Sequence, residues 1–82
     1  MNHQSIIVRA VWDEEAHVWI ATSEDVPGLV AEAGTMEDLR ETVLTRVSEL
    51  LQLNGGAFAL SEIPVHILAE QTTRIANPAM SG

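Results

Sequence analysis

The chain has 82 residues and a formal net charge of −8, because twelve Asp and Glu outnumber four basic residues, all of them Arg. This length allows one small domain, and a hydrophobic content of 46% is typical of a folded protein. The acidic balance argues against nucleic-acid binding by this chain, since phosphate contacts need clustered Lys and Arg. The lack of Cys excludes disulfides, thiolate metal sites and a Cys nucleophile.

The N-terminus does not have the pattern of a signal peptide. Residues 1–4 carry no basic segment followed by an apolar one, and no apolar stretch approaches the ~20 residues of a membrane span. We therefore expect a cytoplasmic protein without membrane contacts.

A β-hairpin is the first predicted element. Residues 5–12 and 17–23 are rich in β-branched and aromatic side chains, and the charged segment 13–16 separates them as a loop would. A symmetric loop pairs Trp12 with His17. A slip of one residue in this register would move every side chain to the other face.

A turn and a short strand follow the hairpin. Pro27 presets φ at one position of the turn 24–28, and Gly28 accepts a positive φ at the next. Residues 29–33 are predicted to form the third strand.

A long amphipathic helix is predicted from Met36 to Leu53, where apolar residues recur every three or four positions. Thr35 has the position of an N-cap, with Asp38 at the third helical residue. Asn and Gly at 54–56 supply its end.

The rest of the chain contains one predicted strand. Residues 57–63 are left unassigned, and a strand at 65–70 completes a domain that covers residues 1–72. The polar tail 73–82 is expected to fray. The predicted fold class is therefore α+β in the order βββ-α-β: an antiparallel sheet of three or four strands with one long helix packed on one face.

Both faces of the predicted hairpin are apolar, whereas a half-solvated hairpin alternates apolar and polar residues. One helix covers one face, and the sequence leaves open which face this is. Monomers rarely expose an apolar patch as large as the second face. We therefore expect a homo-oligomer, a dimer or larger, whose interface draws on Trp12, Val18, Trp19 and Ile20.

No motif in the sequence indicates catalysis or a cofactor. The Ser residues lack the G-x-S-x-G context of a nucleophile, and the Gly pair at 55–56 follows a helix instead of preceding one. The three His come from separate segments without metal-ligand spacing, and they are His3, His17 and His66. We expect no enzyme activity, no metal and no cofactor.

The acidic side chains are the candidate binding residues. A negative field attracts and steers cationic surfaces, although charged loops are also expected simply because they are solvated. Carboxylates arranged for Mg²⁺ would converge on one point, and loop neighbours tend to splay apart. The residues predicted to contact a cationic partner are Asp13, Glu14, Glu15, Glu24, Asp25, Glu37, Asp38 and Glu41.

Between Arg9 and Asn54 the most specific pattern is an Asp-x-Pro-Gly-Leu turn that leads to a Thr-capped helix. It occurs within a set of five segments: Trp-Asp-Glu-Glu-Ala at 12–16, Val-Trp-Ile-Ala at 18–21, Ser-Glu-Asp-Val-Pro-Gly-Leu at 23–29, Ala-Glu-Ala at 31–33 and Thr-Met-Glu at 35–37. With these segments the sequence resembles the HicB-like antitoxin family, and in particular its short stand-alone bacterial branch of unknown function.

The resemblance implies a fold similar to a partial, catalytically degenerate ribonuclease H domain. Full-length members of the family oligomerise and mask HicA, a small basic toxin that cleaves mRNA, and they usually carry a C-terminal DNA-binding segment. Here only a short polar tail follows Leu68, with Arg74 as its one basic residue. The resemblance therefore does not extend to DNA binding, and it supplies no catalytic positions.

Three functions follow from this reasoning, in order of preference. The first is a non-enzymatic protein-binding module, an antitoxin-like partner of a HicA-like toxin or another cationic protein. The second is a self-associating structural or regulatory domain without a toxin partner. The third is a metal-dependent nuclease built on the ribonuclease H resemblance, with Asp13 and Glu14 as ligands.

Overall fold

The computed structural model describes residues 5–54 and 62–80. The α+β class and the βββ-α-β order are confirmed. Within the described ranges, no helix combines the length and apolarity needed to cross a membrane. The predicted helix end at residues 55–56 and the unassigned residues 57–61 lie outside the residues that the structure describes.

The described residues form four strands, one α-helix and a short 3-10 helix. They are β1 (Ile6–Asp13), β2 (Val18–Thr22), β3 (Val30–Ala33), α1 (Met36–Asn54), β4 (Val65–Glu70) and the 3-10 helix η1 (Pro78–Met80).

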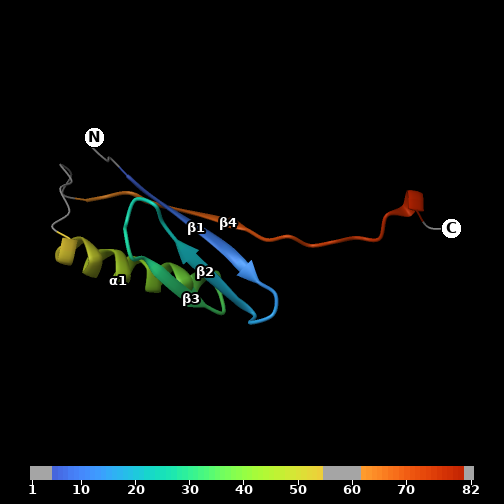
Figure 1. The fold of residues 1–82 in the computed structure, drawn as a ribbon, viewed down its shortest axis with the longest axis horizontal. Helices are drawn as coiled ribbons and strands as arrows, with labels where there is room; N and C mark the ends of the chain where they lie inside the picture. The colour runs from blue at the N-terminus through green and yellow to red at the C-terminus, as the bar shows by residue number, and fades with distance from the viewer. Residues whose placement is uncertain (1–4, 55–61, 81–82) are drawn as a thin grey trace.

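The four strands form one sheet in the order β3-β2-β1-β4 (Figure 1). The sheet is mixed and not wholly antiparallel as predicted, because β4 pairs parallel with β1. The direction follows from α1, which starts where β3 ends and returns the chain along the sheet, so that β4 begins beside the start of β1. The residue pattern of a strand does not encode its direction, and the sequence therefore left this undetermined.

The hairpin register differs from the prediction by two residues, and the predicted pairing was wrong. Trp12 lies opposite Trp19 instead of His17. The reason is a tight turn in which His17 N–H donates to Asp13 O at 2.8 Å and His17 adopts a left-handed φ of 55°. Because side chains alternate with period two, a shift of two leaves each on its predicted face.

The core lies between α1 and one face of the sheet. The amphipathic pattern of α1 places its apolar stripe on the alternate, inward residues of the strands. The helix starts as predicted, with Asp38 N–H donating to Thr35 Oγ1 at 3.1 Å. The buried residues are Ile6, Val8 and Ala10 of β1, Ala21 of β2, Val26 and Leu29 of the following loop, Ala31 of β3, and Leu39, Val43 and Val47 of α1.

The segment after β4 leaves the domain as an extended arm. Residues 71–80 are all exposed, and Figure 1 shows them running away from the sheet toward the C-terminus. The overall extents of 59 × 25 × 18 Å record this elongation. Residues 73–80 of the predicted tail belong to this arm, and η1 is its last described element.

Candidate functional site

The candidate site is the side of the sheet opposite α1, which we call the open face. Its members follow from the strand registers, since paired residues share a face and neighbours along a strand alternate. On β1, Ile6, Val8 and Ala10 lie on the side of the sheet that α1 covers, and the residues between them lie on the open face. The open face consists of Ile7, Arg9, Val11 and Asp13 from β1, Val18, Ile20 and Thr22 from β2, Val30 and Glu32 from β3, and His66, Leu68 and Glu70 from β4.

Apolar side chains are strongly exposed on the open face. Ile7 is 42%, Val11 54%, Val30 56% and Leu68 50% exposed. These residues come from three of the four strands, so they spread over the sheet instead of forming one isolated contact. An exposed apolar surface of this kind usually marks a site of interaction.

Carboxylates flank the apolar centre of the open face. In one row across the sheet, Glu32 lies opposite Ile20, Ile20 opposite Val11, and Val11 opposite Glu70. Arg9 is the one Arg or Lys among the strand positions of this face. The row therefore places two apolar side chains between two negative charges, an arrangement that favours a partner with basic residues beside apolar ones.

Two hollows lie at opposite ends of the open face. The larger, which we call the hairpin-end hollow, has a volume of about 490 Å³ and is lined by Val11, Trp12, Asp13, Glu14, Ile20 and Thr22. The smaller has a volume of about 320 Å³ and is lined by Ile7, Arg9, Thr22, Ser23, Glu24 and Asp25. Each hollow combines apolar and acidic lining residues.

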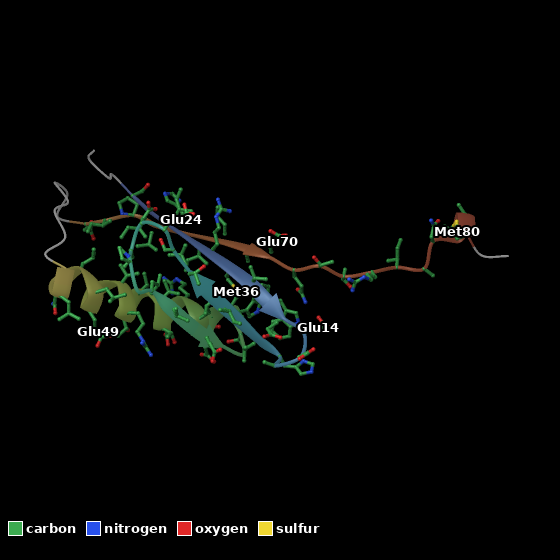
Figure 2. All side chains as sticks on the ribbon, viewed as in Figure 1. Glu14, Glu24, Met36, Glu49, Glu70 and Met80 are labelled. Carbon is green, nitrogen blue, oxygen red and sulfur yellow. The ribbon has the colours of Figure 1, made fainter. Side chains whose placement is uncertain are left out.

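The predicted acidic residues fall into two groups. Glu24 and Asp25 follow β2, whereas the rest lie toward the β1–β2 hairpin; Figure 2 shows Glu14 and Glu24 at opposite ends of the sheet. The start of α1 belongs to the hairpin end, because β3 finishes opposite Trp19 near the start of β2. The hairpin-end group consists of Asp13, Glu14, Glu15, Glu37, Asp38 and Glu41.

Two of these carboxylates hold the backbone. Asp13 Oδ1 accepts hydrogen bonds from the N–H groups of Glu15 (3.0 Å) and Ala16 (3.2 Å) and so closes the hairpin turn. Asp25 Oδ2 accepts the N–H of Ile7 at 2.8 Å. Ser23 Oγ donates to Ile7 O at 2.7 Å and accepts the N–H of Asp25 at 3.1 Å.

The Ser23 and Asp25 side chains make the hydrogen bonds to Ile7 that a neighbouring strand would otherwise make. The pairing of β2 with β1 ends where Thr22 meets Arg9, so the first residues of β1 extend beyond it. Both backbone groups of Ile7 are then bonded by the loop after β2. The carboxylate of Asp25 therefore stabilises the start of β1 by accepting a backbone hydrogen bond. The neighbouring Glu24 is exposed and is the better candidate for contact with a partner.

The four predicted interface residues divide between the two faces. Val18 and Ile20 lie on the open face and are half-buried, while Trp12 and Trp19 lie on the helix side. The two indole rings meet edge to face, with centroids 5.4 Å apart at 62°. The rings of His17 and Trp12 are also in contact, with their centroids 6.1 Å apart.

Sequence reasoning missed the five members of the open face that β3 and β4 contribute: Val30, Glu32, His66, Leu68 and Glu70. For β3 a signal was present, since the small residues Ala31 and Ala33 alternate with Val30 and Glu32. For β4 the sequence carries no signal that separates parallel from antiparallel pairing with β1, and the faces depend on that pairing.

The described residues show a surface for contact. Among them, no group of three or more His, Cys, Asp or Glu is placed to hold a metal ion. Every buried side-chain N and O atom in the described ranges has a hydrogen-bond partner. The open face therefore presents exposed apolar side chains that are flanked by carboxylates.

Three comparisons relate the chain to known proteins. The model of a domain family of unknown function, DUF1902, matches residues 5–77. A crystal structure of hypothetical protein TTHA1013 from the extremely thermophilic bacterium Thermus thermophilus is similar, with 45% sequence identity and a TM-score of 0.65 over 89% of this chain and 99% of that one. No curated protein matches the chain significantly.

Proposed function

The chain belongs to the DUF1902 family, and from this premise we propose that it is a non-enzymatic protein-binding module with an antitoxin-like role toward a small basic protein. The open face is its binding surface, and the carboxylates at the hairpin end select a cationic partner. In this role the protein acts in the cytoplasm, where a HicA-like toxin would meet mRNA.

The observation that carries the proposal is the exposure of apolar side chains on the open face. Val11 and Val30 expose more than half of their surface although they sit within strands. Burying such side chains is favourable at about 25 cal/mol for each Å² of apolar area removed from water. A partner that covers the sheet therefore gains free energy from the whole face.

Charge supports a basic partner. The chain carries a formal net charge of −8, and Glu14, Glu32 and Glu70 lie beside the apolar centre of the open face or at its hairpin end. Opposite charge on the partner raises the association rate and excludes acidic competitors. The resemblance of residues 9–54 to HicB-like antitoxins agrees with this chemistry, since the toxins of that family are small and basic.

Self-association without a toxin partner is the second candidate, and the same face favours it. A second copy offers apolar area of identical composition, so two open faces would bury Val18 and Ile20 together. A two-fold interface repeats each contact, so a pairing of Arg9 with a carboxylate of the other copy would occur twice. The two candidates differ in what is recovered with the protein from cells.

The test is affinity purification of the tagged protein from its native host, followed by mass spectrometry. We expect a small basic protein in stoichiometric amount with the wild type and less of it with the double variant Glu14→Gln/Glu37→Gln. The matched control, Glu49→Gln/Glu62→Gln, removes the same charge from exposed positions away from the hairpin end (Figure 2 shows Glu49). Recovery of the protein alone as an oligomer would favour self-association.

Salt gives a second readout on the purified complex. Exposed charges are screened over about 8 Å at physiological ionic strength. The affinity for the basic partner should therefore fall as NaCl is added, and the fall should be smaller for the Glu14→Gln/Glu37→Gln variant. An affinity that stays constant from low to high salt would contradict charge selection.

A further inference from the structure

The C-terminal arm, residues 71–80, is built to reach beyond its own domain. Every one of its residues is exposed. The radius of gyration is 16.4 Å, against about 12 Å expected for a compact domain of this length. Figure 2 places Met80 far from the sheet. An arm in this position is available to another molecule.

The arm has local order and presents apolar side chains to water. Asn77 closes its last turn, because Oδ1 accepts the N–H of Ala79 at 2.9 Å and its carbonyl accepts the N–H of Met80 at 3.0 Å. Ile75 is 87% and Met80 79% exposed. An extended segment with large apolar residues gains free energy when it binds along an apolar surface.

The direction of β4 decides where the arm leaves the sheet. Since β4 runs parallel to β1, it ends at Glu70 opposite Val11, beside the hairpin-end hollow. The arm then continues beyond the end of the sheet (Figure 1). Its extended part, residues 71–77, spans up to about 23 Å at ~3.3 Å per residue, which is enough to cross the open face of a neighbouring domain.

Charge complementarity identifies the surface that fits the arm. Arg74 is the one charged side chain between Gln71 and Gly82, in a chain whose formal net charge is −8. The hairpin-end hollow has Val11 and Ile20 as apolar lining residues and carboxylates beside them. A basic residue next to a large apolar one matches this lining.

We propose that the arm of one copy docks in the hairpin-end hollow of a second copy of this chain. Ile75 packs on Val11 and Ile20, and Arg74 lies beside Glu14. In a two-fold dimer the exchange is reciprocal, so each copy fills the other's hollow. The inference rests on the proposed function, in that the open face must be a protein-binding surface, and it names the first occupant of that surface.

Disulfide trapping tests the contact directly, because the native chain has no Cys. A tagged chain with Ile75→Cys is mixed with an untagged chain carrying Val11→Cys and exposed to a mild oxidant. We expect the mixed covalent dimer in high yield. The control replaces Ile75→Cys by Leu53→Cys, at a position on α1 that is 80% exposed. Equal yields from the two pairs would overturn the proposal.

Sedimentation equilibrium of the full chain measures the contribution of the arm. Ile75→Asp should weaken dimerisation at least tenfold without unfolding the domain, since Ile75 lies outside the core, and Leu53→Asp should leave it unchanged. Arg74→Glu and Glu14→Arg should each weaken it a few-fold, and the combination should restore it. A double variant weaker than both single variants would contradict the pairing of these two residues.

A third variant separates this inference from the proposed function. Val18→Arg alters the open face at a residue that lies beside the hairpin-end hollow, opposite Asp13, but does not line it. If Val18→Arg weakens association and Ile75→Asp does not, the open face binds protein and the arm is not its occupant. If neither variant changes association, or if the wild type is monomeric at micromolar concentration, arm exchange is overturned while binding of a basic partner remains measurable by affinity purification.

Discussion

The two faces of the sheet are made by the same strands and have opposite surroundings. On β1, Ile6 and Val8 are fully buried beneath α1, whereas Ile7 and Val11 are about half exposed. All four are large and apolar. Burial in this domain therefore depends on what lies over the residue and not on the residue type.

The comparison indicates that the fold uses one apolar face and leaves a second one available. Strands in one-sided sheets place polar residues on the solvated face. Here only half of the twelve open-face residues are polar or charged, and the other half are apolar: Ile7, Val11, Val18, Ile20, Val30 and Leu68. This is the physical basis for assigning the open face to a partner.

Truncating a core residue should give the largest effect and sharpen the contrast between the faces. Leu39→Ala leaves a cavity against fully buried neighbours and should lower the free energy of unfolding by about 2–5 kcal/mol. Val30→Ala removes a side chain that is already in water and should cost less than about 1 kcal/mol. Urea denaturation monitored by circular dichroism measures both.

The same pair of variants also reports on the open face. If a partner copy covers Val30, the loss of unfolding free energy caused by Val30→Ala should grow as protein concentration rises, because association stabilises the folded state by mass action. If Val30→Ala and Leu39→Ala lower the free energy of unfolding equally at low concentration, the two faces are not distinct.

Changing the open face itself should have the next largest effect, on association instead of stability. Val18→Arg places a charge where apolar area would be buried, and we expect at least a tenfold rise in the dimer dissociation constant, or about 1.4 kcal/mol. Leu53→Arg is the control, since Leu53 is equally apolar and lies on α1. Analytical ultracentrifugation distinguishes the two outcomes.

Local signals in the sequence predicted most of the fold. The period of three and four from Met36 to Leu53 predicted α1, and the run 65–70 coincides with β4. The hairpin register failed because Asp13 extends β1 by one residue and its side chain closes a turn that a symmetric loop does not contain. Side-chain capping of a turn depends on geometry that residue types alone leave open.

The candidate site was predictable only in part, because it is assembled across strands. Val18 and Ile20 were identified from the hairpin, but the helix-covered face could not be chosen by sequence, and Trp12 and Trp19 belong to that face. The acidic residues were identified by charge alone. Their separation into two groups depends on sheet topology, which is a long-range property of the chain.

The backbone link beside the open face should have a smaller effect. Asp25→Ala removes the acceptor of the Ile7 N–H at 2.8 Å and should lower the free energy of unfolding by about 1–2 kcal/mol, as for a charge-assisted hydrogen bond. Glu24→Ala changes an exposed neighbour in the same loop and should stay within about 0.5 kcal/mol. Equal losses of unfolding free energy for Asp25→Ala and Glu24→Ala would mean that the hydrogen bond from Asp25 to β1 does not stabilise the fold.

The smallest expected effect concerns the start of the helix that makes the two faces different. Thr35→Ala removes the Oγ1 acceptor of the Asp38 N–H and should cost about 1 kcal/mol, while Thr35→Ser keeps the acceptor and should cost less. Because α1 covers only one face, the loss should raise amide hydrogen exchange at Leu39 and Val43 and leave dimerisation through the open face unchanged. A matching loss of dimerisation would show that the open face depends on the helix after all, and the two faces would then act as one cooperative unit.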